Sequence, residues 1–374
     1  MIELKEPVEQ VILVATPRRG NSAAGTAEEH LDELARLADT AGASMVGRLV
    51  QRVQKPNPHS YLGSGKLKEL SQEVSARDAT LVIFDDELSP AQGKALEDEL
   101  EVRVMDRAEL ILDIFATRAR TKEARMQVEL AQLEYLLPRL ARMWVHLSRI
   151  RGGIGLRGPG ETQIETDRRL IGRRITQLKK KLQGVARHRE VIRSGRRAML
   201  TAALVGYTNS GKSSLLKVLT GANPLIEDRL FATLDTLTRE FVIDSQRIRL
   251  VDTVGFVRKL PHHLVASFRS TLEEANKADI LLHVVDASHE AWEEQVASAE
   301  NVLRELEMQD RSVTYVFNKM DLLDEPDHFA LQAGQRFDKS VFVSALKADV
   351  DDLKSELARA SRRRGSYPAA ALKT

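Results

Sequence analysis

The sequence predicts an α/β protein of several parts, and three observations support this prediction. Short apolar strands alternate with amphipathic helices over roughly the first third of the chain. Two apolar stripes at helical spacing follow, separated by a glycine-rich break. A strand, a glycine-rich loop and a helix then follow one another directly. We expect a small α/β domain (1–120), a helical hairpin (121–197), a second α/β domain (198–360) and a basic tail (361–374).

Composition limits the class of protein. A chain of 374 residues suggests two or three domains, and 43% hydrophobic with 29% charged residues is ordinary for a globular protein. No apolar run approaches the length of a bilayer span, and the acidic start MIELKEPVEQ does not resemble a signal peptide. We therefore expect a cytoplasmic protein, without membrane association. The absence of cysteine excludes disulfides and thiolate chemistry.

The N-terminal region alternates between the two periodicities. The expected strands are 11–16, 45–53, 80–84 and 102–105, and the expected helices are 27–38, 66–74, 90–100 and 109–118. Such alternation is typical of a small parallel sheet with helices on its faces. Gly63 to Lys66 (GSGK) opens a helix, and we interpret it as a turn with a glycine cap because it lacks the full spacing of a phosphate loop. No catalytic cluster is expected here.

The middle region has a helical pattern. Apolar residues recur every three or four positions in two series, which are Met126, Leu130, Leu133, Leu137, Leu140, Trp144 and Leu147, and then Ile171, Ile175, Leu178, Leu182 and Val185. The pattern predicts two long antiparallel helices packed along an apolar seam. Pro138 should kink or interrupt the first helix.

The break between these helices, residues 149–160, contains five glycines, one proline and the arginines Arg149, Arg151 and Arg157. Between Arg151 and Arg197 there are 14 Lys/Arg against 4 Asp/Glu, although the whole chain carries only +2. A solvated connection on a charged helix is one interpretation. We favour RNA contact by an arginine-bearing hairpin tip, because charge excess, glycine content and helix length coincide.

The most informative stretch is GYTNSGKS, which follows an apolar strand (199–205) and opens a helix. Two glycines allow backbone N–H groups to point inward, and the helix N-terminus attracts a polyphosphate. Lys212 would bind the β and γ phosphates, and the hydroxyl of Ser213 would bind Mg²⁺. The residues expected to surround the nucleotide here are Gly206, Tyr207, Thr208, Asn209, Ser210, Gly211, Lys212, Ser213 and Ser214.

A second motif, Leu250 to Phe256 (LVDTVGF), ends a strand that is expected to pair with 240–243. Asp252 would order the water shell of Mg²⁺, and Gly255 would offer its N–H to the γ phosphate. Between the two motifs, the loop 229–236 supplies threonines that could bind Mg²⁺ when a γ phosphate is present. We select Thr233, with Thr236 as the alternative.

Two further motifs predict the base. In Asn318-Lys319-Met320-Asp321, the Asp321 carboxylate can accept two hydrogen bonds from guanine that adenine cannot donate. Asn318 would brace the phosphate loop, and the stem of Lys319 would cover the ring. In Ser344-Ala345-Leu346, a small residue would let a backbone N–H reach the guanine O6. Because the four motifs follow strands in order, they predict a P-loop GTPase domain that binds GTP or GDP with Mg²⁺.

At this level of detail the chain resembles the HflX family of ribosome-associated GTPases. The resemblance covers roughly residues 10 to 350 and includes the stretches YLGSGK, FDDELSPAQ, VMDRAELILDIFATRART, QVELAQLEYLLPRL and GGIGLRGPGETQIETDRR. It implies that the N-terminal domain and hairpin bind the large ribosomal subunit and its RNA. It also implies that the protein splits stalled or idle ribosomes under stress, and that GTP hydrolysis recycles it.

Two residues and the C-terminus modify this expectation. Phe256 stands where Ras-like enzymes carry a water-orienting glutamine, so intrinsic hydrolysis should be slow and should be stimulated by ribosomes. Asn209 matches a loop asparagine that helps to coordinate K⁺ in some related GTPases, which makes K⁺ a candidate cofactor. Many family members continue into a further small domain, whereas here a helix at 350–360 is followed by a tail that we expect to be disordered.

We expect a monomer. The alternative to a ribosome-splitting GTPase is a ribosome-assembly protein or RNA chaperone with a regulatory GTP site. A third hypothesis is an autonomous signalling GTPase, but it leaves the positive charge of the hairpin unexplained.

Overall fold

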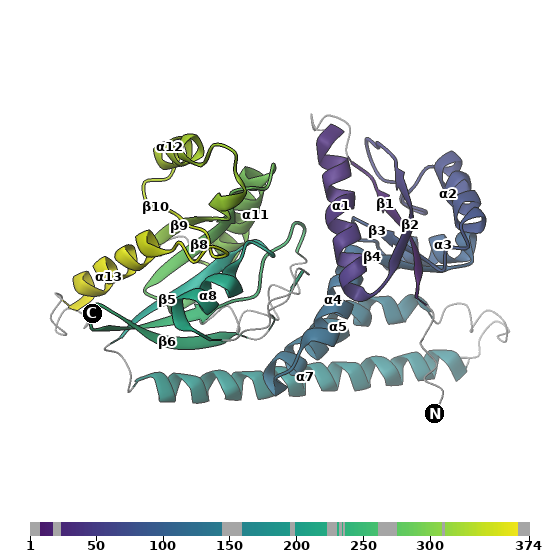
Figure 1. Cartoon of the computed structure of the whole chain (residues 1–374). Coiled ribbons are helices and arrows are strands. Elements are labelled where there is room, and N and C mark those ends of the chain that lie inside the picture. Colours follow the sequence, from purple (N-terminus) through teal and green to yellow (C-terminus); the bar gives the residue numbers. More distant parts are fainter. Residues whose placement is uncertain are drawn as a thin grey trace, which may run out of the picture. The chain divides into compact units, whose positions relative to one another are not determined.

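The computed structural model describes residues 8–17, 24–143, 159–194, 199–222, 230–231, 234, 236–260, 275–308 and 311–365 (Figure 1). The chain forms two compact units. One comprises Met1–Thr117 and Val128–Lys180, and the other comprises Arg118–Gln127 and Lys181–Thr374. The two long helices of the middle region therefore contribute to both units.

The first unit is a parallel sheet covered by helices, as the sequence predicts. Strands β1 (Gln10–Ala15), β2 (Ser44–Val50), β3 (Leu81–Phe84) and β4 (Arg103–Asp106) lie in the order β2-β1-β3-β4. The intervening helices are α1 (Ala24–Ala41), α2 (Ser64–Ala76), α3 (Pro90–Leu100) and α4 (Arg107–Arg118). Figure 1 shows α1 on one face of the sheet, with α2 and α3 on the other. The buried side chains of α2 and α3 form one apolar cluster with those of the strands.

Local sequence explains the helix boundaries in this unit. Ser89 caps α3, because its hydroxyl accepts the Gln92 N–H while the Gln92 side chain accepts the Ser89 N–H. Pro90 occupies the first turn, where its missing N–H costs nothing. Gly63 is the N-cap of α2, which agrees with the interpretation of the GSGK stretch as a capped turn.

Helices α5 (Lys122–Met143) and α7 (Pro159–Ser194) form the middle region. Helix α5 continues through Pro138, so the interruption considered from the sequence does not occur. On α7 the predicted stripe is less exposed than its surroundings, and Leu178 is fully buried. Ion pairs join Arg174 to Glu129 (2.6 Å) and Lys179 to Glu134 (2.8 Å). The tip arginines Arg149, Arg151 and Arg157 lie outside the described residues.

The second unit contains a six-stranded sheet in the order β10-β9-β8-β5-β7-β6, in which only β6 runs antiparallel to its neighbour. The strands are β5 (Leu200–Gly206), β6 (Leu237–Ile243), β7 (Gln246–Asp252), β8 (Ile280–Asp286), β9 (Val313–Asn318) and β10 (Ser340–Phe342). The helices are α8 (Lys212–Thr220), α11 (Trp292–Glu305), α12 (Pro326–Arg336) and α13 (Asp351–Gly365), with a short 3-10 turn at Met320–Leu322. The predicted pairing of β6 with β7 is confirmed.

The C-terminal boundary differs from the prediction. Helix α13 includes residues 361–365, which we expected to begin a disordered tail. Tertiary contacts explain the longer helix. The buried Ser361 donates its hydroxyl to Gln246 Oε1 (3.1 Å), and Arg362 pairs with Asp244 (3.0 Å). Both partners lie at the turn between β6 and β7, so the end of the helix is fixed by residues distant in sequence.

Candidate functional site

The loop between β5 and α8 has a backbone that only glycine can provide at two positions. Gly206 has φ +138°, and an added Cβ would lie 2.3 Å from the carbonyl oxygen of Val284. Gly211 has φ +94°, and an added Cβ would lie 2.1 Å from Asn318 Nδ2. Neither neighbour can move easily, because Val284 is on the central strand and Asn318 is itself hydrogen-bonded. The two glycines thus allow the loop to approach the adjacent strands closely.

Lys212 is the first residue of α8, and its ammonium group lies inside this loop. Its Nζ donates to the carbonyl oxygens of Gly206 (3.1 Å) and Tyr207 (2.6 Å). Burial lowers the pKa of Lys212 to about 8, and the nearby Asp252 carboxylate offsets only part of this effect. The protein therefore holds a positive charge that is incompletely compensated, which is the condition for strong binding of an anion.

Two side chains with oxygen atoms that could bind a metal lie together beside this lysine. The Ser213 hydroxyl donates to Asp252 Oδ2 at 2.7 Å, and Asp252 is fully buried at the end of β7. Hydroxyl and carboxylate oxygens are the ligands that Mg²⁺ prefers, and a phosphate-bound Mg²⁺ takes few ligands from protein, because phosphates and water supply the others.

The buried polar atoms of the loop also suit a phosphate. Ser210 is 1% exposed, and its Oγ has no hydrogen-bond partner. A buried hydroxyl without a partner is rare in folded proteins, because it forfeits the hydrogen bonds it makes with water. Phosphate oxygens would supply the missing acceptor. Ser214 is half-buried in the first turn of α8.

The segment after Asp252 pairs directly with the phosphate loop. The Thr208 N–H donates to the Phe256 carbonyl (2.7 Å), and the Phe256 N–H donates to the Gly206 carbonyl (3.0 Å). Gly255 lies so close that an added Cβ would be 2.6 Å from Thr208 Cα and 3.0 Å from Lys212 Nζ. The Phe256 ring is fully buried, and a phenyl ring has no hydrogen-bonding group with which to orient a water molecule.

The loop 229–236, whose threonines the sequence predicts as Mg²⁺ ligands, is described only in part. Thr233 lies outside the described residues, so its selection as a metal ligand stays a prediction. Leu230, Phe231 and Leu234 are buried. The Phe231 N–H donates to Thr208 Oγ1 at 3.0 Å, which ties this loop to the phosphate loop in the described structure.

The base motifs are brought together by Asn318. Its Nδ2 donates to the Ser210 carbonyl (2.9 Å), and its Oδ1 accepts the Ala345 N–H (3.0 Å). The Ser344 hydroxyl donates to Asp321 Oδ1, which orients that carboxylate. Because the Ala345 N–H already has a partner, it would have to exchange that partner to reach a guanine O6. The Leu346 side chain is 83% exposed, so only its backbone could serve the site.

The sequence reasoning missed β8, although this strand lies between the phosphate-loop strand and the base-motif strand. Its sequence, ILLHVVD, is a fully buried apolar run interrupted by His283 and ended by Asp286. The sequence signal that could have predicted this strand is a short apolar run that ends in a carboxylate. Asp286 pairs with Lys319 at 2.6 Å, and His283 is 1% exposed and lies beside Tyr315 with a ring separation of 5.3 Å.

Burial, together with the charge of Lys212, lowers the pKa of His283 to about 4. An unfolded histidine titrates near 6.5, so below that pH the unfolded state binds a proton that the folded state rejects. The contribution of His283 to the free energy of unfolding is therefore intact above pH 6.5 and falls towards pH 4. The two values imply a loss of roughly 3 kcal/mol at pH 4.

We expect the free energy of unfolding to fall less between pH 7 and pH 4 in a His283→Phe variant than in the parent protein. The difference between the two decreases should be roughly 3 kcal/mol. Denaturant unfolding at pH 7, 5.5 and 4 measures the difference. His328→Gln is the matched control, because that side chain is 62% exposed. Parallel pH profiles for the parent and His283→Phe would contradict the expectation.

The fold and the site together define a P-loop GTPase domain: a phosphate loop, a serine and aspartate pair suited to Mg²⁺, and a base motif at one edge of a mainly parallel sheet. Family models agree. Residues 28–116 match "GTP-binding GTPase N-terminal", residues 118–196 match "GTP-binding GTPase Middle Region", and residues 201–319 match "50S ribosome-binding GTPase".

The chain belongs to the HflX family of GTPases. It is 51% identical over 327 residues to GTPase HflX of Lacrimispora saccharolytica, which covers 87% of this chain and 77% of that protein. It is 47% identical over 300 residues to GTPase HflX of Escherichia coli K12, which covers 79% of this chain and 70% of that protein. The protein thus binds guanine nucleotides and hydrolyses GTP.

A crystal structure of SsGBP with GDP is similar in fold, with a TM-score of 0.51 and 24% sequence identity over 95% of this chain and 99% of that chain. Within the ranges that the structure describes, none of the helices combines the length and the apolar content needed to span a bilayer.

Proposed function

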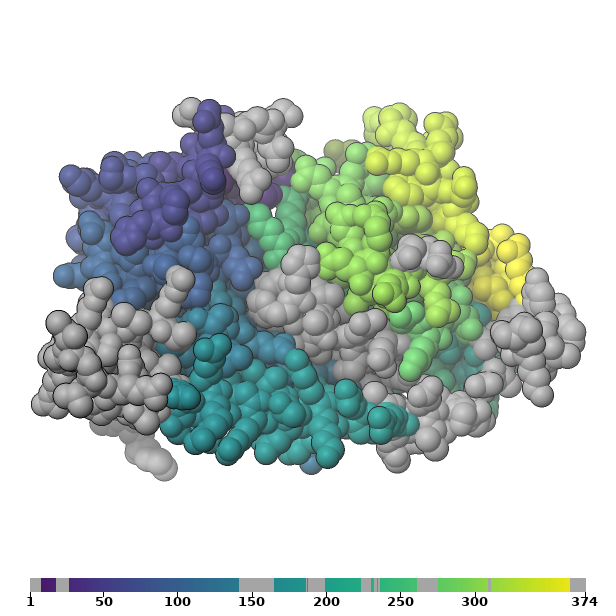
Figure 2. Space-filling view, turned by 180° about the vertical axis from the view of Figure 1, so that it is seen from behind, coloured from purple at the N-terminus to yellow at the C-terminus, as the bar shows by residue number. Residues whose placement is uncertain are grey.

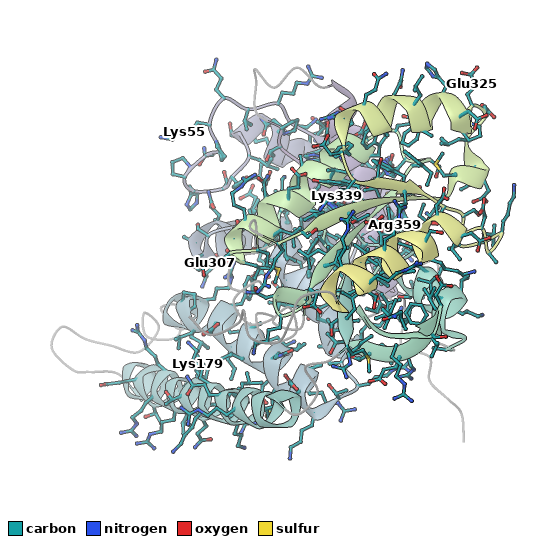
Figure 3. The ribbon with its side chains drawn as sticks, turned by 90° about the vertical axis from the view of Figure 1, so that its left-hand side faces the viewer. Lys55, Lys179, Glu307, Glu325, Lys339 and Arg359 are labelled. Carbon is teal, nitrogen blue, oxygen red and sulfur yellow. The ribbon has the colours of Figure 1, made fainter. Side chains whose placement is uncertain are left out.

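We propose that this GTPase binds the large ribosomal subunit through its middle region and separates stalled or idle ribosomes, with GTP hydrolysis releasing it for another cycle. The exposed basic surface of α7 is the observation that carries the proposal. Its exposed cations include Arg168, Arg169, Arg173, Lys179, Lys180 and Lys181. Figure 2 shows the side chains of α7 (teal) at the molecular surface, and Figure 3 shows side chains standing out from this helix, with Lys179 labelled.

The charge of α7 fits a polyanion better than a protein partner. Glu129 and Glu134 of α5 form ion pairs with Arg174 and Lys179 of α7. Arg168, Arg169, Arg173, Lys180 and Lys181 are also exposed. Phosphate contact would release condensed counterions from RNA, which favours binding in proportion to the number of contacts. The match of residues 201–319 to a ribosome-binding GTPase model supports the ribosome as the source of that RNA.

In the nucleotide site we assign roles to the residues that surround it. Lys212 would bind the β and γ phosphates, and the Gly255 N–H would contact the γ phosphate. Ser213 and Asp252 would hold Mg²⁺, with Thr233 as a further ligand. When bound, Mg²⁺ neutralises charge on the phosphate oxygens. The buried ring of Phe256 leaves the attacking water without a side chain to orient it, so we propose slow basal hydrolysis and stimulation by the ribosome.

The test of the RNA contact is a triple variant. Replacing Arg149, Arg151 and Arg157 by alanine is expected to weaken binding to purified large subunits and to reduce the slope of log K against log salt by up to about 3. Sedimentation at several salt concentrations measures both. Replacement of the same three residues by lysine is the control, because it keeps the charge. Unchanged binding by the alanine variant would remove the tip from the proposal.

Light scattering of intact ribosomes with the protein distinguishes the alternative function. A splitting factor lowers the scattering in the presence of GTP. A ribosome-assembly protein or RNA chaperone would leave the ribosomes associated and would bind free ribosomal RNA or precursor particles instead.

A further inference from the structure

Asp286 and Lys319 form an ion pair beside the base motifs. Strand β8 ends at Asp286, which lies opposite Asn318 of β9 in the parallel register. Lys319 follows directly, and its Nζ contacts Asp286 Oδ2 at 2.6 Å. The other carboxylate oxygen is occupied separately, because Oδ1 accepts the Ser288 N–H (3.1 Å) and the Ser288 hydroxyl (2.6 Å). Asp286 thus has one oxygen fixed by its own turn and the other directed to the lysine.

The burial of this pair makes it more than an exposed surface contact. The Asp286 side chain is 12% exposed and that of Lys319 is 26% exposed. Exposed ion pairs contribute little to stability because water and salt screen their charges. A largely desolvated ion pair keeps its two side chains in a defined geometry. The backbone of Lys319 also has φ +65°, a left-handed conformation that residues with a Cβ seldom adopt. Tertiary contacts must therefore maintain the position of this residue.

We propose that Asp286 is a positioning residue for the nucleotide base. By holding the ammonium group of Lys319 at the end of β8, it directs the aliphatic stem of the lysine along the face of the purine ring. This inference rests on the proposed base site at Asn318, Lys319 and Asp321. A four-carbon stem that is free to change rotamer would lose conformational entropy on each binding event, and the ion pair removes that cost in advance.

The proposal distinguishes the roles of the two carboxylates. Asp321 reads the polar edge of guanine, so its loss should change which base is preferred. Asp286 acts through a contact with the ring face, which guanine, hypoxanthine and xanthine share. Its loss should weaken the binding of all three bases by a similar factor, and of diphosphates and triphosphates alike, because the phosphate loop is not involved.

The experiment measures Kd values of GDP, GTP, IDP and XDP for Asp286→Asn by competition with a fluorescent nucleotide. The variant is nearly isosteric, and its remaining oxygen can still accept from Ser288, but its amide group cannot accept from Lys319. We expect about a tenfold increase in every Kd. Asp286→Glu should recover part of the affinity. Asp338→Asn, an exposed position before β10, is the matched control and should leave the affinities unchanged.

A double-mutant cycle tests whether Asp286 acts through Lys319. Lys319→Met keeps an apolar stem without the charge, so Asp286→Asn should have no further effect on the Kd for GDP in that background. An equal loss in both backgrounds would overturn the proposal, as would a fall in the melting temperature of the nucleotide-free protein that accounts for the loss. If Asp321→Asn alters base preference while Asp286→Asn does nothing, only this inference fails. If neither variant changes binding, the base site itself is misplaced.

Discussion

Replacing Lys212 by alanine is expected to abolish nucleotide binding, with an increase in the Kd for GDP of at least about a hundredfold. The ammonium group is buried, donates to two carbonyl oxygens and lies near the Asp252 carboxylate. A polyphosphate brings several negative charges close to this ammonium group. Removing the group should therefore remove a large part of the electrostatic attraction between the protein and the phosphates. Calorimetric titration with GDP and GTP measures the loss.

The same residue should destabilise the protein when no nucleotide is present. Its pKa is lowered from 10.5 to about 8, so at neutral pH the folded state holds a proton that it binds more weakly than the unfolded state does. Stability attributable to Lys212 therefore rises as pH increases from about 8 to 10.5. Lys212→Met, which removes the charge and keeps the hydrocarbon, is expected to increase the free energy of unfolding at pH 7 by up to about 3 kcal/mol.

Two controls separate these effects from misfolding. Lys217→Ala lies in the last turn of the same helix at an exposed position, and it should bind GDP normally. A Lys212 variant that is both more stable and unable to bind satisfies the expectation. A variant of Lys212 that binds GDP like the parent protein would show that the phosphates lie elsewhere.

Replacing Asp321 by asparagine is expected to shift the preference from guanine to xanthine nucleotides, with a loss of GTP affinity on the order of a hundredfold. The carboxylate can accept from both the ring N–H and the exocyclic amine of guanine, whereas an amide can donate to the oxygen that xanthine carries in place of the amine. The hydrogen bond from Ser344 fixes the orientation in which this exchange would occur. Competition between GTP and XTP measures the change.

Asp324→Asn is the control for this experiment, because it lies three residues further along the chain, is exposed and should leave the base preference unchanged. Retained preference for GTP in Asp321→Asn would place the base outside the Asn318 to Asp321 motif. Loss of both GTP and XTP binding, with normal unfolding behaviour, would mean that Asp321 contributes affinity without selecting the base.

Local signals determined much of the fold. Helix α3 has the predicted bounds, and Ser89, Pro90 and Gln92 provide its N-terminal cap within four positions of one another. The phosphate loop is equally local, since eight consecutive residues contain its glycines, lysine and serine. The predicted stripe on α7 is also its less exposed face. Each of these features depends on interactions within one or two turns of chain.

Other features could not be obtained from local patterns. Strand β8 has no alternation, because it is buried on both faces. Asp286 gains its partner 33 residues later, and the extension of α13 depends on Gln246 and Asp244 across the second unit. The low pKa values of Lys212 and His283 arise mainly from burial, which segments far apart in the chain create together.

By itself, the sequence determined the family, the phosphate loop, the order of the base motifs and the basic middle region, since these are properties of residue type and spacing. Only the tertiary structure decided that the lysine charge is incompletely compensated, that the Phe256 ring is buried and that Asp286 holds Lys319. The physical reason is that desolvation and ion pairing depend on which segments surround a group, and strands far apart in the chain supply those surroundings.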